Sequence, residues 1–158
     1  MPYLELEDFA TLSGSLLGLD HGRKTIGIAL SDSAMTMALP LKTLIKTKQI
    51  HDFDMLINII QSRSIVGIVL GYPLHENGDA GARAQSVRAF ARNFLAVYDI
   101  PLLLWDERYS TQIMEAEMIE KLDMSRAKRK QKIDALAAQY ILQTALDAIH
   151  TQKKPPAY

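Results

Sequence analysis

The chain of 158 residues has the length of one domain, and its 48% hydrophobic and 23% charged residues are ordinary for a soluble globular protein. It contains no cysteine, which excludes disulfides, thiolate metal sites and cysteine nucleophiles. The 18 basic residues balance the 18 acidic ones, so any affinity for nucleic acid has to come from local clusters. No apolar run is long enough to span a membrane, and we expect a cytoplasmic protein.

The sequence predicts one domain over residues 14–150, with an N-terminal extension at 1–13 and a C-terminal tail at 151–158. Hydrophobic patterns predict strands at 15–22, 24–32 and 37–45, a helix at 51–62, a strand at 64–73, a helix at 82–98, a strand at 100–105, and helices at 110–122 and 133–150. The alternation of strands and helices indicates an α/β fold with a largely parallel sheet, to which the opening hairpin adds one antiparallel strand.

Acidic residues stand where the predicted strands end. Asp20 ends the first strand, Asp106 and Glu107 follow the fifth, and Asp134 lies near the start of the last helix beside small residues. Ligands of open α/β sheets bind at the carboxyl ends of the strands, so we expect these acids to converge. Three carboxylates within about 4 Å of one another repel by roughly 4 kcal/mol per pair. Mg²⁺ or Mn²⁺ would relieve that repulsion, whereas the alternative is that each acid serves a turn or pairs with a nearby base.

Four motifs carry a family resemblance, and they are LLGLDHGRKTIGIALSD, VLGYPLHENGDAG, WDERYST and KIDALAAQYILQ. Their order and spacing resemble the YqgF family, RNase H-like proteins associated with Holliday junction resolution and with pre-16S rRNA processing. The resemblance implies an RNase H-like fold, with a mixed five-stranded sheet that has one antiparallel strand and is flanked by helices. It also implies a catalytic, metal-binding triad of Asp20, Glu107 and Asp134, with Asp106 competing with Glu107 as the ligand.

The same resemblance implies structural loop positions, which fall here on Gly22, Gly71, Pro73 and Gly78. Two histidines depart from the family pattern. His21 stands between Asp20 and Gly22, where the family usually has an apolar or aromatic residue. His75 lies in the loop after Pro73 and could contact a phosphate or move a proton, since histidine titrates near neutrality.

A basic segment directly precedes Asp134 and contains Arg126, Lys128, Arg129, Lys130 and Lys132. Lysine and arginine contacts to phosphates supply most nonspecific affinity for nucleic acid, so we expect this segment to bind the substrate backbone. Arginines of the helix at 82–98 could extend the same surface. The alternative is that the segment is only a solvated face.

We therefore expect a metal-dependent nuclease that uses Mg²⁺ or Mn²⁺ to hydrolyse structured nucleic acid. The resemblance implies the 5′ end of precursor 16S rRNA as substrate, with ribosome assembly intermediates as partners. The first alternative is a resolvase of four-way DNA junctions, which a stable homodimer would favour because symmetric cleavage needs two sites. The second is a noncatalytic RNA-binding or ribosome-associated module. The third is a sugar-kinase or actin-like phosphotransferase, because GLDHGRKTIGIAL also resembles their phosphate-binding hairpin, although that architecture places the nucleotide between two such domains.

Overall fold

The computed structural model describes residues 5–73, 81–107 and 126–153, with the backbone alone for 126–131, 152 and 153. Its elements are α1 (Leu6–Phe9), β1 (Ser15–His21), β2 (Thr25–Ser31), β3 (Ala38–Ile45), α2 (Gln49–Ser62), β4 (Ile65–Tyr72), α3 (Ala82–Val97), β5 (Leu102–Asp106) and α5 (Arg126–Lys153). The helix predicted at 110–122 lies outside the described residues. Within these ranges, no helix has the length and apolar character that crossing a membrane requires.

The five strands form one mixed sheet in the order β3-β2-β1-β4-β5. Strand β2 is antiparallel to both of its neighbours, whereas β1, β4 and β5 are parallel. The predicted α/β fold with a single antiparallel strand is therefore confirmed. The parallel arrangement also brings the carboxyl ends of β1, β4 and β5 to the same edge of the sheet.

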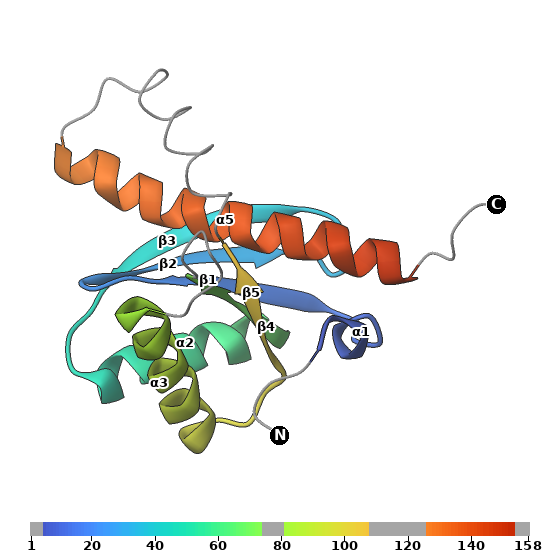
Figure 1. The fold of residues 1–158 in the computed structure, drawn as a ribbon, viewed down its shortest axis with the longest axis horizontal. Helices are drawn as coiled ribbons and strands as arrows, with labels where there is room; N and C mark the ends of the chain where they lie inside the picture. The colour runs from blue at the N-terminus through green and yellow to red at the C-terminus, as the bar shows by residue number, and fades with distance from the viewer. Residues whose placement is uncertain (1–4, 74–80, 108–125, 154–158) are drawn as a thin grey trace.

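Helices cover both faces of the sheet, as Figure 1 shows, with α5 along one face and α2 and α3 on the other. Because successive side chains of a strand point to opposite faces, each central strand contributes to both cores. In β1, Leu17 and Leu19 pack in the cluster beneath α2 and α3, whereas Leu16 packs in the cluster beneath α5. The apolar run of β4 divides in the same way, which explains its nearly continuous hydrophobicity.

Two elements differ from the sequence predictions. Helix α5 begins at Arg126 rather than at residue 133, so the basic segment is helical and not a loop. Lysine and arginine have good helix propensity, which a reading based on the charge run overlooks. The predicted N-terminal extension contains α1, whose Phe9 is fully buried in the cluster beneath α5.

Candidate active site

The predicted convergence of acids occurs for Asp20 and Glu107. Asp20 is near the end of β1, and Glu107 directly follows β5, at the shared carboxyl edge. Their side chains are only 15% and 7% exposed, respectively. Asp106, in contrast, is the last residue of β5 and is exposed. Of the two neighbouring acids, Glu107 is thus the one that faces the interior next to Asp20.

Gly71 provides the space in which the Glu107 carboxyl group lies. A Cβ atom at this position would collide with Glu107 Oε2 and would lie 2.7 Å from Ile141 Cδ1. The prediction of Gly71 as a loop residue is wrong, because β4 continues its pairing with β5 through Gly71 and Tyr72. Its contribution to the site is the absence of a side chain.

Of the other predicted positions in this region, the structure describes Gly22 and Pro73. Gly22 lies in the turn between β1 and β2, where its N–H donates a hydrogen bond of 2.8 Å to the carbonyl oxygen of Thr25. Pro73 directly follows β4. His75 and Gly78 lie outside the described residues.

Arg83, in the first turn of α3, is the cation that faces the acidic pair. Its Nη2 atom lies 3.9 Å from Asp20 Oδ1 and 3.8 Å from Glu107 Oε1. The sequence suggested Arg83 only as part of a basic surface, and its pairing with the two acids was missed. The available signal was indirect: two acids at buried strand ends need a nearby cation or shared protons.

Asp134 lies on α5 and reaches the same region from the face of the sheet opposite to the one that α3 covers. Its Oδ2 atom accepts a 2.7 Å hydrogen bond from the Thr25 hydroxyl group at the start of β2. The helix backbone approaches the sheet so closely here that a Cβ atom at Gly27 would collide with the Asp134 carbonyl oxygen. Thr25 and Gly27 therefore set the position of Asp134, and sequence reasoning identified neither.

Burial dominates the electrostatics of the pair. It raises the pKa of Asp20 from 3.8 to about 6, a rise that Arg83 opposes and the Asp134 carboxylate increases. It raises the pKa of Glu107 from 4.5 to about 8, with the charge of Asp20 adding to the rise and Arg83 again opposing it. The two groups therefore hold protons unusually well when no other cation accompanies them.

The donor set suits a hard divalent cation, because it consists of carboxylate oxygens. Glu107 Oε2 is buried and has no hydrogen-bond partner among the described residues, so it retains the capacity to bind a ligand. Across the described parts of the chain, however, no three His, Cys, Asp or Glu side chains are grouped closely enough to hold one metal ion. Asp20 and Glu107 thus fit a metal as a pair, while Asp134 is engaged by Thr25.

His21, the residue after Asp20, is buried, with its ring 4.5 Å from the ring of Phe90. Burial, together with the smaller effects of the Lys46 and Arg83 charges, lowers its pKa from 6.5 to about 4. Its neutral Nε2 atom lies 3.1 Å from Lys46 Nζ. His21 is consequently a packed, neutral residue that holds a lysine beside the turn.

The structure describes the basic segment only in part. The backbone of Arg126, Lys128, Arg129 and Lys130 belongs to the first turns of α5, and Lys132 is exposed. The segment therefore leads directly into the part of α5 that carries Asp134. Its contact with nucleic acid stays a prediction.

The mixed five-stranded sheet, with helices on both faces and two buried acids at its carboxyl edge, has the RNase H-like fold. The family model described as "RuvX: Holliday junction resolvase" matches residues 14–148. The chain belongs to this family, also called YqgF, and the resemblance noted from the motifs is confirmed.

Similar proteins agree with this assignment. A "Putative pre-16S rRNA nuclease" of Rhodospirillum rubrum is 43% identical over 161 residues and covers 100% of both chains. A protein of the same name in Sphingopyxis alaskensis is 48% identical over 145 residues, which cover 90% of this chain and 94% of its own. Among solved structures, T. thermophilus RuvC in complex with Holliday junction substrate has a TM-score of 0.55 at 10% identity, covering 87% of this chain and 97% of its own. At that identity the structural similarity shows the fold alone.

Proposed function

We propose that the protein is a metal-dependent nuclease that cleaves phosphodiester bonds of structured nucleic acid, with the 5′ end of precursor 16S rRNA as its cytoplasmic substrate. One observation carries this proposal, namely the buried pair of Asp20 and Glu107, in which one carboxylate oxygen has no hydrogen-bond partner in the described parts of the chain. The curated relatives named as pre-16S rRNA nucleases support the choice of substrate.

Asp20 and Glu107 would hold the Mg²⁺ or Mn²⁺ ion, and the charge of Asp134 would strengthen the field around it. Such a cation, when bound, activates water and stabilises the leaving oxygen of a phosphodiester. Arg83 offsets the charge of the two acids in the absence of the ion, and it remains close enough to contact a substrate phosphate. Thr25 fixes the orientation of Asp134 through its hydrogen bond.

The test compares cleavage of precursor rRNA and of a four-way DNA junction by the purified protein with Mg²⁺ or Mn²⁺. Asp20→Asn should abolish cleavage, while its melting temperature in EDTA stays the same or rises because the substitution removes a buried charge. The matched control is Asp99→Asn, which changes an exposed acid in the segment before β5. Cleavage by Asp20→Asn at the rate of the wild-type protein would refute the assignment.

Cleavage of four-way junctions is the second candidate function. The description of the family model favours it directly. Because symmetric junction cleavage requires two active sites, this function predicts a homodimer in solution, which light scattering would detect. A monomer that cleaves precursor rRNA and leaves the junction intact would exclude it.

A noncatalytic RNA-binding or ribosome-associated role is a further alternative. It predicts that the protein binds precursor rRNA, or an assembly intermediate that contains it, without cleaving it under any metal condition. Metal-dependent cleavage that disappears in Asp20→Asn would exclude this role.

A further inference from the structure

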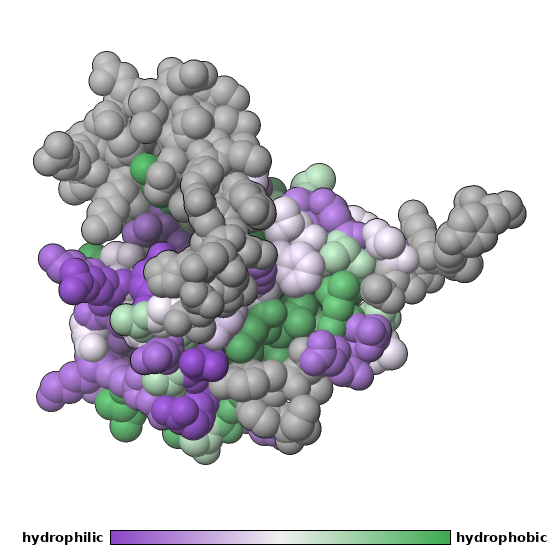
Figure 2. Space-filling model, in the orientation of Figure 1, coloured by the Kyte–Doolittle hydropathy of each residue, from purple (hydrophilic) through white to green (hydrophobic). Residues whose placement is uncertain are grey.

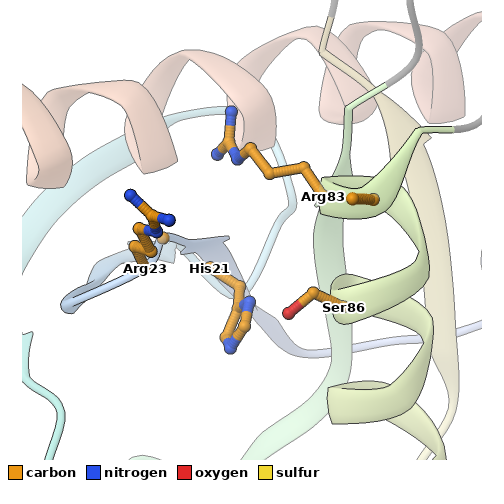
Figure 3. Close-up of a pocket in the computed structure, with 6 residues that line it drawn as sticks. His21, Arg23, Arg83 and Ser86 are labelled. Atoms are coloured by element: carbon orange, nitrogen blue, oxygen red, sulfur yellow. The ribbon is translucent and has the colours of Figure 1, made fainter.

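A cavity of about 410 Å³ opens beside the acidic pair, between the β1–β2 turn and the first two turns of α3. Its described lining residues are His21, Gly22, Arg23, Ala82, Arg83 and Ser86. In Figure 3, Arg23 and Arg83 approach the cavity from opposite sides, and the Ser86 hydroxyl group points into it. The volume falls in the range of pockets that hold small ligands or parts of larger ones.

The lining is basic. Two guanidinium groups face the cavity, and none of its six described lining residues is acidic. Lys46 adds a third cation behind the turn, where its ammonium group donates a 3.1 Å hydrogen bond to the Gly22 carbonyl oxygen. Figure 2 shows hydrophilic residues gathered at the end of the molecule that carries this turn and the start of α3. An anion is therefore the ligand that this cavity favours.

The arrangement of donors matches a phosphate group. A guanidinium group binds phosphate oxygens through two parallel N–H donors, and a serine hydroxyl group can donate a further hydrogen bond. Helix α3 begins at this cavity, and its N-cap, Gly81, supplies no side chain to the first N–H groups. The positive end of the helix dipole thus reinforces the two arginines.

The cavity also lies next to the proposed cleavage site. Arg83 lines it and simultaneously faces Asp20 and Glu107, at 3.9 Å and 3.8 Å. A phosphate held between Arg23 and Arg83 would therefore lie next to the acidic pair, with the Arg83 side chain between them. A polynucleotide presents its phosphates as a regular series, so one can occupy the cavity while a neighbour lies at the acids.

We propose that the cavity between Arg23 and Arg83 binds a backbone phosphate of the nucleic-acid substrate and so positions the neighbouring phosphodiester for cleavage. This inference rests on the proposed function, because it takes nucleic acid as the ligand. Arg23 is the residue to substitute in a test of this inference. It is exposed in the turn between β1 and β2, and within the described residues it forms no ion pair with a carboxylate. Arg83 is unsuitable for a test because it also contacts the acids.

The first measurement uses a fluorescein-labelled RNA containing the 5′ end of precursor 16S rRNA and the inactive Asp20→Asn background. Arg23→Ala should weaken binding about tenfold and reduce the slope of log affinity against log salt by about 1. Arg23→Lys should keep the slope but recover only part of the affinity, because lysine lacks the two parallel donors. The matched control is Arg63→Ala at the end of α2, beside the start of β4 and far from the carboxyl edge. Equal affinity and slope for Arg23→Ala and Arg63→Ala would overturn the inference.

A second measurement separates this inference from the proposed function. Titration of the wild-type protein with inorganic phosphate should produce saturable amide shifts at Gly22 and Ser86, and Arg23→Ala should abolish them. Absence of these shifts, with cleavage of precursor rRNA intact, refutes the phosphate site and leaves the nuclease function standing. Failure of the wild-type protein to bind or cleave any nucleic acid refutes the proposed function, and with it the role of this cavity in substrate binding.

Discussion

Glu107→Gln should stabilise the protein at alkaline pH when no divalent cation is present. The carboxyl group of Glu107 is buried beside Asp20, and its pKa is raised from 4.5 to about 8. Above that pH the folded protein has to hold an ionised carboxylate in a poorly solvated position. Glutamine has nearly the same shape without the charge, so the substitution removes this penalty.

The raised pKa sets the direction and size of the effect. When the pKa of an acid is higher in the folded protein than in the unfolded chain, the folded protein loses stability as the pH rises from the unfolded pKa through the folded pKa. For Glu107 this loss begins near pH 4.5 and is complete above about pH 8. Each pKa unit corresponds to about 1.4 kcal/mol, so the total cost reaches several kilocalories per mole. Because Asp20 shares part of that cost, we expect a gain of about 2 to 3 kcal/mol, or roughly 5 to 10 °C in Tm.

Thermal melting in EDTA at about pH 5 and about pH 8.5 measures the effect, because Glu107 changes from mostly protonated to mostly ionised between them. The difference between variant and wild-type protein should be small at the lower pH and large at the higher one. Asp106→Asn is the matched control, since it removes the neighbouring exposed charge and should shift Tm little at either pH. A Glu107→Gln protein that is no more stable at the higher pH would show that the burial argument is wrong.

Three further changes test other parts of the structure. Gly27→Ala should destabilise the fold by about 3 kcal/mol and reduce cleavage, because its methyl group would collide with the Asp134 carbonyl oxygen. The matched change Gly67→Ala meets only side chains and should cost less than about 1 kcal/mol in the same unfolding measurement. Asp32→Ala should cost about 1 kcal/mol near neutral pH in urea unfolding, because the ionised carboxylate accepts hydrogen bonds from the Thr36 hydroxyl group and from the backbone N–H groups of Met37 and Thr36, which lower its pKa. This cost should shrink as the pH falls through that pKa. Alanine at the three basic positions of 128–130 should weaken nucleic-acid binding and flatten the salt slope by about 2 to 3, and an unchanged slope would argue against phosphate contact.

The fold could be predicted wherever hydrophobic pattern and chain topology act together. The apolar runs at 64–73 and 100–105 predict β4 and β5, because a strand covered on both faces needs apolar side chains at nearly every position. Helix α1 could not be predicted, because its four residues are too few to show a period. The first turns of α5 were missed for a different reason, since charged residues there interrupt the apolar stripe.

The acidic residues of the site could be predicted from the sequence, but the residues that pair with them, Arg83 and Thr25, could not. The rule that strand ends converge is sufficient to bring Asp20 and Glu107 together, because β1, β4 and β5 run parallel. The contacts of Arg83 and Thr25 depend on the rotation of α3 and α5 against the sheet, which no local pattern encodes. Opposite charges in a balanced sequence offer many candidate pairs, so composition alone could not select Arg83.

Two glycines show how much of this geometry depends on missing side chains. Gly27 and Gly71 each stand inside an apolar strand, where glycine is less favourable than alanine by roughly 0.5 to 1 kcal/mol. In both cases the space is occupied by a part of the site: the backbone of Asp134 lies against Gly27, and the carboxyl group of Glu107 lies against Gly71. A glycine within a strand therefore indicates the close approach of another group, even where the sequence cannot say which group it is. The spacing of the acids depends on these two positions as directly as on the acids themselves, because any side chain there would push α5 or Glu107 away from Asp20.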